Sequence, residues 1–252
     1  MNKFEEADKL KIEFRGLQEL TLIDYPGKIA CTLYVFGCNY RCPYCHNPEL
    51  INRELAEKET QLYKPSELLQ FLHDRKSFLE GICITGGEPT LHQDLPVFIA
   101  MVKQMGYKVK LDTNASNPSM LKELIEKKLI DYIAIDYKAP LEKWQEVVKV
   151  KVDMEKVKES LKLAVESAKY GIEHEFRVTV VPKLLDPEDI IEIAKEIKQL
   201  GSNKLYLQQF NPLNTLDPEY SKIKPYPVET LKNLVAEIKK LGLECEIRNE
   251  TY

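Results

Sequence analysis

Residues 36–46 read FGCNYRCPYCH and directly follow an apolar run. Cys38, Cys42 and Cys45 therefore stand at a C-x3-C-x2-C spacing, and half of the six cysteines of the chain fall within eight residues. Three thiolates at this spacing can bind three irons of a cubane cluster and leave the fourth iron open. The spacing predicts a 4Fe-4S site at which a substrate or cofactor can reach an iron.

Three other kinds of site share parts of this pattern. Cys42 and Cys45 match a redox dithiol of the glutaredoxin type, and with His46 they match a haem-attachment string. Both interpretations leave Cys38 unused. A glutaredoxin-like unit is far shorter than 252 residues, and haem attachment requires export, for which residues 1–6 provide no apolar signal. A structural zinc site needs a fourth ligand, which His46 is poorly placed to supply because it adjoins Cys45.

Composition limits the class of protein. A chain of 252 residues with 44% hydrophobic content is long enough for one α/β domain with a substantial core. Its 36 basic and 40 acidic residues are interspersed, so no basic surface for nucleic acid is predicted. No apolar stretch approaches the roughly 20 residues of a membrane span. We expect a cytoplasmic protein that binds neither nucleic acid nor membrane, with Cys31, Cys83 and Cys245 as buried small side chains.

Short β-rich runs alternate with helical patterns along the chain, which is typical of parallel strands joined by crossover helices. Proline near the first turn, aspartate caps and closing glycines mark several of the helices. The strands are predicted at residues 29–36, 81–85, 108–112, 132–136, 175–181 and 204–208. The helices are predicted at residues 65–79 and 94–105, from 117 and from 153 to 171, at 186–201 and around 231–241.

Polar or reactive residues stand at the end of each predicted strand. After the cysteine loop come Gly86, Gly87 and Glu88, then Asp112, Thr113 and Asn114, then Asp136, Tyr137 and Lys138, then Arg177 on the fifth strand, and Gln208 and Gln209 on the sixth. In parallel βα barrels the carboxyl ends of the strands build the active site. The six sets of residues are therefore expected on one face.

These residues resemble the radical S-adenosylmethionine enzymes. The three-cysteine spacing, with the aromatic Tyr44 beside Cys45, is similar to the cluster motif of that family, and residues 86–89, GGEP, are similar to its second signature. The resemblance spans about residues 17–211 and implies an α/β fold, a partial (β/α)6 barrel of the TIM type. We expect a single radical SAM domain over residues 1–252, with an N-terminal extension at 1–16 and a helix and further strand within 212–252.

The resemblance also implies cofactor contacts. S-adenosyl-L-methionine would place its amino and carboxylate groups on the open iron, since the electron must pass from the cluster into a C–S bond. Gly86 and Gly87 would approach its methionyl group, and Glu88 would orient the ammonium. The adenine would contact Tyr44, Cys45 and His46, and the ribose and carboxylate would contact Asp136, Tyr137 and Lys138, with Thr113 nearby. Asp112, Thr113 and Asp136 would surround a monovalent cation. Arg177 would pair with the cofactor carboxylate or fix a layer of the barrel.

A second, more specific resemblance points to one branch of this family. Residues 20–28, LTLIDYPGK, run into the cysteine strand as in the activating enzymes of anaerobic ribonucleotide reductase and pyruvate formate-lyase. This implies an anaerobic oxidoreductase whose 5′-deoxyadenosyl radical removes a hydrogen from a glycine of a partner glycyl radical enzyme, with a flavodoxin or ferredoxin-like electron donor. A radical enzyme for a small molecule or peptide side chain, and a closed metal-binding scaffold, remain alternatives. Residues 141–152 are too long for a turn and are predicted to form a lid or docking surface.

Overall fold

One curved sheet of eight strands organises the computed structural model, which describes residues 4–248. The strands lie side by side in chain order. They are β1 (Phe14–Thr21), β2 (Ala30–Val35), β3 (Gly81–Gly86), β4 (Lys108–Thr113), β5 (Tyr132–Asp136), β6 (Glu173–Val180), β7 (Lys204–Gln209) and β8 (Glu244–Arg248). β1 is antiparallel to β2, and every later pair is parallel. Within residues 4–248, no pairing joins β1 to β8, so the barrel is partial.

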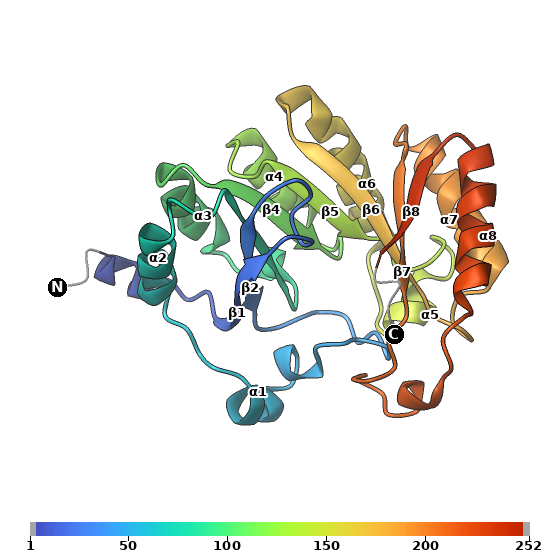
Figure 1. Cartoon of the computed structure of the whole chain (residues 1–252), viewed down its shortest axis with the longest axis horizontal. Helices are drawn as coiled ribbons and strands as arrows, with labels where there is room; N and C mark the ends of the chain where they lie inside the picture. The colour runs from blue at the N-terminus through green and yellow to red at the C-terminus, as the bar shows by residue number, and fades with distance from the viewer. Residues whose placement is uncertain (1–3, 249–252) are drawn as a thin grey trace.

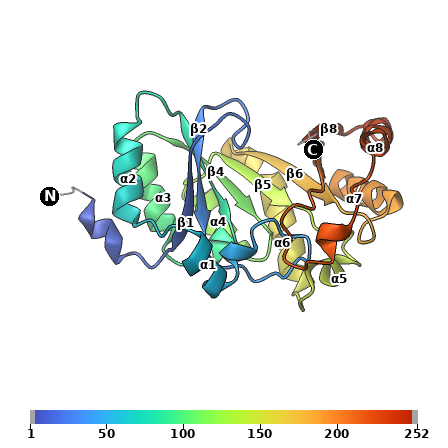
Figure 2. The same cartoon turned by 60° about the horizontal axis from the view of Figure 1, so that its bottom comes forward.

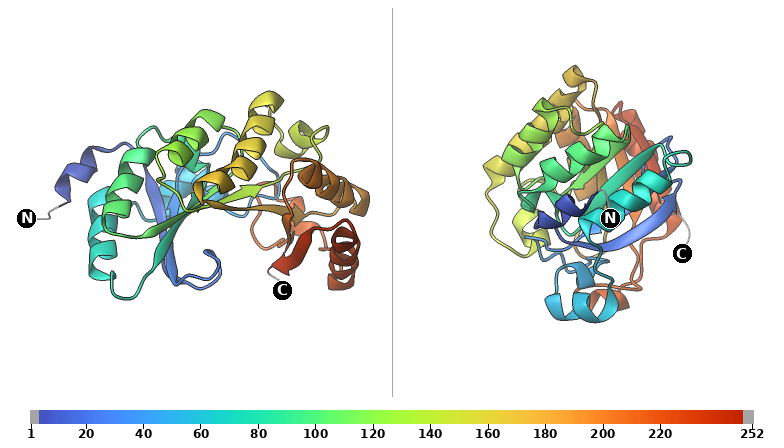
Figure 3. Two further views of the ribbon diagram at one scale, coloured as in Figure 1. Left: turned by 90° about the horizontal axis from the view of Figure 1, so that it is seen from above. Right: turned by 90° about the vertical axis from the view of Figure 1, so that its left-hand side faces the viewer.

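Helices cover the convex face of this sheet and leave the concave face open (Figures 1 and 3). The α-helices are α1 (Arg53–Glu59), α2 (Pro65–Asp74), α3 (Leu95–Gln104), α4 (Pro118–Glu126), α5 (Trp144–Val148), α6 (Met154–Glu166), α7 (Pro187–Gln199) and α8 (Val228–Lys240). Short 3-10 helices lie at Glu5–Lys9, Pro48–Leu50, Pro89–Leu91, Ser167–Tyr170 and Tyr220–Lys222. No helix within residues 4–248 is long and apolar enough to cross a bilayer.

The predicted α/β fold with a partial TIM-type barrel is confirmed, and so are its six strand and helix units. β8 supplies the further strand expected after the C-terminal helix. One strand and two α-helices within residues 4–248 were not predicted: β1, α1 and α5. Their sequences carry weak signals, since β1 is an edge strand with three exposed residues in a row and α1 buries Ala56 as its one fully covered side chain.

Apolar and polar side chains alternate along the strands, which gives the barrel an apolar outer layer and a polar interior. Leu33 and Leu111 are fully buried in the hydrophobic core beneath the helices. Their neighbours Thr32, Tyr34 and Asp112 line a cavity on the concave face instead. Successive side chains of a strand point to opposite faces, so the same strands that build the core also deliver polar groups to the interior.

A buried ion pair links β8 to β6. Arg248 on β8 donates two hydrogen bonds to Glu175 on β6, at 2.7 and 2.8 Å, and the carboxylate of Glu175 is fully buried. The hydroxyl of Tyr132 donates to the same carboxylate at 2.6 Å. The guanidinium also lies 3.8 Å from the centre of the Tyr206 ring. This network attaches the edge strand β8 to the centre of the sheet.

We expect Arg248→Met to lower the free energy of unfolding by about 3 kcal/mol, because it leaves the Glu175 carboxylate buried without its cation. Urea denaturation followed by circular dichroism measures the change. The double variant Arg248→Met/Glu175→Met should recover most of the loss, since it removes the stranded charge as well. An additive double variant would show that packing of the arginine, and not the ion pair, determines the stability.

Candidate active site

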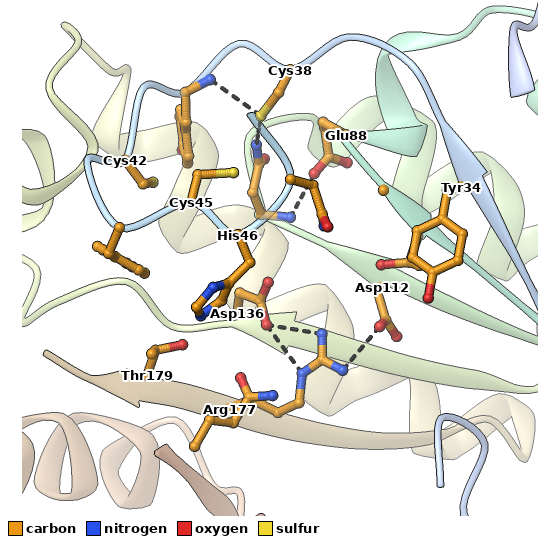
Figure 4. A pocket seen from close by; sticks show the side chains of 18 of the residues that line it. Tyr34, Cys38, Cys42, Cys45, His46, Glu88, Asp112, Asp136, Arg177 and Thr179 are labelled. Carbon is orange, nitrogen blue, oxygen red and sulfur yellow. Dashed lines mark hydrogen bonds and ion pairs between the residues drawn. The ribbon is translucent and has the colours of Figure 1, made fainter. Parts of the chain in front are cut away.

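A cavity of about 500 Å³ lies at the carboxyl ends of the parallel strands and continues into the barrel. It gathers side chains from β2 to β7 and from the loops that follow these strands (Figure 4). The predicted site residues that line it are Cys38, Cys42, Tyr44, Cys45, His46, Gly86, Gly87, Glu88, Asp112, Thr113, Asp136, Lys138 and Arg177. This placement agrees with the expectation that the motifs meet on one face of the sheet.

The cysteine loop is held in place by its own backbone and by one arginine. Gly37 donates its N–H to the carbonyl of Leu50 at 2.7 Å, and Cys45 donates to the carbonyl of Cys42 at 3.0 Å. Arg41 donates from Nη1 to the carbonyl of Cys38 at 2.7 Å. Cys38, Cys42 and Cys45 are all free, and their thiols border a common space in Figure 4. Hydrogen bonds within the chain thus stabilise this turn.

Helix α5 supports this loop from outside the cavity. The indole of Trp144 is fully buried and donates to the hydroxyl of Tyr40 at 3.3 Å. Val148 accepts a hydrogen bond from the backbone of Arg41 at 3.0 Å. The buried side chains of residues 141–152 therefore support the cysteine loop, and a lid or docking role for this segment stays a prediction.

Burial and a nearby lysine set the acidity of the thiols. Burial raises the pKa of Cys38 to about 11 and that of Cys42 to about 12. The ammonium of Lys138 opposes this effect at both thiols and at Cys45, whose pKa is also raised by burial. A bound cation such as iron would favour the thiolate further, so the thiols are protonated when empty and deprotonated on metal binding.

The raised pKa values of the thiols predict how the rate of thiol alkylation depends on pH. At pH 8 alkylation by iodoacetamide in the metal-free protein should be about 100-fold slower at Cys38 and about 1,000-fold slower at Cys42 than at an unperturbed thiol, because little thiolate is present. The rate should rise about tenfold per pH unit up to about pH 10, since the thiolate fraction grows in that proportion below the pKa. Peptide mass spectrometry of quenched samples measures the rate at each cysteine. A plateau near pH 9 would contradict the raised pKa values.

The glycine turn after β3 contacts the beginning of the cysteine loop directly. Gly87 donates to the carbonyl of Val35 at 2.9 Å, and Glu88 donates from its backbone to the carbonyl of Gly37 at 2.7 Å. A β-carbon on Gly87 would lie 2.1 Å from that same carbonyl oxygen. Gly86 has φ of 115°, which a residue with a side chain rarely adopts. Both glycines are therefore required for the two signature motifs to pack together.

Glu88 ties the turn to the end of β4. Its fully buried carboxylate accepts hydrogen bonds from the hydroxyl of Thr113 at 2.7 Å, the N–H of Asn114 at 2.6 Å, and the backbone and hydroxyl of Thr90. Burial raises the pKa of Glu88, and these hydrogen bonds partly offset the rise. The structure shows Glu88 as an internal brace; its contact with a substrate ammonium stays a prediction.

Arg177 joins the ends of β4, β5 and β6. It donates to Asp112 at 2.9 Å and to Asp136 at 2.8 and 3.0 Å, while Lys138 donates to Asp136 at 3.2 Å (Figure 4). Burial raises the pKa of Asp136, but the cations of Arg177 and Lys138 outweigh it and hold that pKa below its usual range. Arg177 therefore fixes a layer of the barrel, and its pairing with a cofactor carboxylate stays a prediction.

The geometry does not favour the predicted monovalent cation. The carboxylates of Asp112 and Asp136 already pair with protein cations, and the hydroxyl of Thr113 donates to Glu88. A monovalent cation at Asp112, Thr113 and Asp136 therefore stays a prediction.

The prediction is wrong for the side chain of Tyr137. This residue is 1% exposed, and its hydroxyl donates to Glu196 at 2.8 Å on the outer side of the sheet. Its ring packs edge-on against Trp144, with centroids 5.2 Å apart. Successive side chains of an extended segment point to opposite faces. Asp136 and Lys138 face the cavity, so Tyr137 between them points outward.

A segment after β7 supports the cysteine loop and was not predicted. Asn214 donates to the carbonyl of His46 at 2.9 Å, and the carbonyl of Asn214 lies 3.1 Å from the His46 ring. Leu216 donates to the carbonyl of Cys45 at 3.1 Å, and Phe210 stacks on the His46 ring. Figure 2 shows the segment before α8 beside the cysteine loop. Burial lowers the pKa of His46, so this ring is neutral in the neutral pH range.

Other cavity residues lie deeper in the barrel and on the far wall. They are Asp24, Thr32, Tyr34, Thr85, Thr179, Gln208 and Asn211, among others. Asp24 accepts a hydrogen bond from the hydroxyl of Thr32 at 2.5 Å. A signal was present in the sequence, because polar residues at alternate positions of otherwise apolar strands indicate a polar interior.

Comparisons with known proteins agree with this site. Residues 33–181 match the family model of the Radical SAM superfamily, which is more than half of the chain. The chain belongs to the radical SAM superfamily. This radical SAM protein is 38% identical over 237 residues to a Methanocaldococcus jannaschii protein that is provisionally named a glycyl-radical enzyme activating enzyme, covering 92% of the chain and 91% of that relative.

Solved structures share the fold of this radical SAM protein. Streptococcus suis SuiB bound to S-adenosylmethionine has a TM-score of 0.62 at 20% identity, covering 84% of this chain and 48% of that one. QueE from Escherichia coli has a TM-score of 0.54 at 12% identity, covering 98% of both chains. The family uses a 4Fe-4S cluster and S-adenosylmethionine, as predicted from the motifs.

The residues present fit both groups. Cys38, Cys42 and Cys45 are soft, free donors on one turn, and a cubane requires only that each thiolate reach a different iron. The cavity beside them offers the ammonium of Lys138, the partly buried carboxylate of Asp136 and the close backbone of the glycine turn. A cavity of about 500 Å³ lies within the range of cofactor sites.

Proposed function

We propose that this radical SAM protein activates a glycyl radical enzyme by removing a hydrogen atom from a glycine Cα of that partner. The observation that carries the proposal is the 38% identity with a relative named for this activity over nearly the whole length of both chains. A second relative from the same organism, with the same kind of name, is 29% identical over 217 residues. The sequence resemblance at residues 20–28 points to the same branch.

The chain's own residues have defined tasks in this proposal. Cys38, Cys42 and Cys45 would hold the cluster. When bound, the cluster and S-adenosylmethionine supply a 5′-deoxyadenosyl radical by one-electron cleavage of a C–S bond. The ammonium of Lys138 would face the carboxylate of S-adenosylmethionine. Asp136, which Arg177 keeps ionised, would accept hydrogen bonds from the ribose hydroxyls of the same cofactor.

The deeper cavity would receive the glycine segment. Tyr34, Thr179 and Gln208 line it and offer hydroxyl and amide groups, which suit a peptide backbone without a side chain at the reacting residue. Proximity is the main contribution expected from the protein, because the reacting carbon atoms must meet in a site from which water is excluded.

Deuterium transfer tests this function. The reconstituted protein, reduced without oxygen, is incubated with S-adenosylmethionine and a glycyl radical enzyme of the same host that was produced with glycine deuterated at Cα. Mass spectrometry should find 5′-deoxyadenosine heavier by one deuterium, and an alanine at the radical glycine should remove the label. Unlabelled 5′-deoxyadenosine with every candidate partner would contradict activation and favour a small-molecule or peptide side-chain substrate.

A further inference from the structure

Asn114 lies directly beside the first cysteine of the motif. It follows β4, lines the cavity and is 5% exposed. Its side-chain Nδ2 lies 3.8 Å from Sγ of Cys38, which is within hydrogen-bond reach because sulfur is larger than oxygen. The backbone N–H of Tyr40 donates to the same sulfur at 3.4 Å, and dashed lines in Figure 4 mark both contacts. Cys38 thus receives one hydrogen bond from its own loop and a second from a residue 76 positions later in the chain.

The hydrogen-bond partners of the Asn114 amide determine its orientation. Its Oδ1 accepts a hydrogen bond from the backbone N–H of Ser116 at 3.0 Å, and a backbone N–H can only donate. Turning the amide by 180° would set Nδ2 against that N–H, so the oxygen has to face Ser116. Nδ2 then directs its two hydrogens at Oδ1 of Asn39, at 2.9 Å, and at Cys38. The side chain therefore presents a hydrogen-bond donor, and not an acceptor, to the Cys38 thiol.

The backbone around Asn114 is fixed as well. Its N–H donates to the carboxylate of Glu88 at 2.6 Å, which links it to the glycine turn after β3. The next residue, Ala115, is buried and has φ of 65°, in the left-handed region that a residue with a side chain enters at a cost. This turn brings the N–H of Ser116 back to the amide oxygen. The amide is therefore held in place by contacts on both sides along the chain.

A hydrogen bond at this sulfur favours the reduced state of a cluster bound there. One-electron reduction adds one negative charge to the cluster and its thiolates, and a hydrogen bond to a thiolate stabilises that charge. Because Asn114 is buried, its hydrogen bond acts in a low dielectric, where it is stronger than in water. Hydrogen bonds to the sulfurs are among the factors that set the reduction potential of iron–sulfur clusters. The position of Asn114 therefore bears on the potential.

We propose that Asn114 is a positioning residue that raises the reduction potential of the cluster through its N–H···S hydrogen bond to Cys38. One electron passes from a low-potential reductant to the cluster, the reductant is oxidised by one electron, and the amide hydrogen stays on Nδ2. Asn114 acts through Cys38 and contacts neither reacting carbon. The proposal rests on the cluster of the radical SAM family and not on the glycyl radical partner, so either proposal can fail without the other.

Redox titration of the reconstituted protein tests this role. Titanium(III) citrate supplies the electrons, each Ti(III) becoming Ti(IV), and electron paramagnetic resonance measures the reduced cluster at each potential, without S-adenosylmethionine or a partner protein. Asn114→Leu replaces the amide by an apolar side chain of similar size, and Asn114→Asp keeps the oxygen that accepts from Ser116 but removes the hydrogen-bond donor. Asn39→Ala is the matched control, because it removes the other acceptor of the same amide and leaves the contact with Cys38.

In Asn114→Leu the ratio of reduced to oxidised cluster at a fixed potential should fall about tenfold, which lowers the midpoint potential by about 59 mV. Asn114→Asp should lower the potential further, because its carboxylate adds negative charge beside the sulfur. Asn39→Ala should leave the potential unchanged. An unchanged or higher potential in the Asn114 variants, or an equal fall in the Asn39 control, would overturn the proposal. Loss of iron from both Asn114 variants would also overturn it, since the residue would then serve cluster assembly and not the potential.

Discussion

Replacing Cys42 with alanine should abolish the cluster and, with it, cleavage of S-adenosylmethionine. Cys42 is the middle cysteine of the motif, and the residue is 7% exposed on the cavity wall. Two remaining thiolates cannot hold a cubane that needs three protein ligands, because one further iron would be open to solvent and lost. Iron analysis and chromatography of 5′-deoxyadenosine after anoxic reduction measure both effects.

Cys245→Ala is the matched control for this variant. Cys245 is also free and buried, at 1% exposed, but it lies on β8 away from the motif. The control should retain about four irons per chain and full cleavage. Full cleavage in the Cys42 variant would show that the cluster assignment is wrong.

Replacing Gly87 with alanine should separate the two signature motifs. The added β-carbon would lie 2.1 Å from the carbonyl oxygen of Gly37 and 2.6 Å from its carbon, and neither backbone atom can turn aside as a side chain can. The start of the cysteine loop must then move, which also breaks the hydrogen bond from Glu88 to Gly37. We expect a loss of about 3 kcal/mol in the free energy of unfolding, at the upper end of overpacking, together with loss of iron.

Denaturation curves and iron content of the Gly87 variant are best compared with those of Gly171→Ala. Gly171 has φ of 77°, and nothing lies within 4 Å of the position of its added β-carbon. That control should lose only about 1 kcal/mol through backbone strain and should keep its iron. A Gly87 variant that is as stable as the control and binds the cluster normally would contradict the close packing of the two motifs.

Much of the fold could be predicted from the sequence because its signals are local. Apolar strands, amphipathic helices and proline or glycine boundaries gave the six repeating units, and polar residues at strand ends gave the face of the site. β1 and α5 escaped prediction because tertiary contacts stabilise them. Trp144 and Val148 are buried beneath a loop that lies about 100 residues earlier, which no local pattern reveals.

Site residues that belong to a sequence motif could be predicted well. Residues whose role depends on the direction of the side chain could be predicted less well. The cysteines and the glycine turn lie together as expected. Tyr137 was misplaced because a strand-end triplet does not show which residue faces outward. The cation predicted at Asp112 and Asp136 stays a prediction, and the sequence did not show that Arg177, from a later strand, pairs with both carboxylates. Such long-range pairing is visible only in the folded chain.

An electron paramagnetic resonance spectrum tests the central claim most directly. The anoxically reconstituted and reduced protein is mixed with S-adenosylmethionine and a glycyl radical enzyme of the same host, and the spectrum is recorded after rapid freezing. Activation predicts a glycine-type doublet that disappears when any component is omitted or when Cys42 is alanine. A reduced cluster signal and 5′-deoxyadenosine without a doublet, for every glycyl radical enzyme of the host, would contradict it.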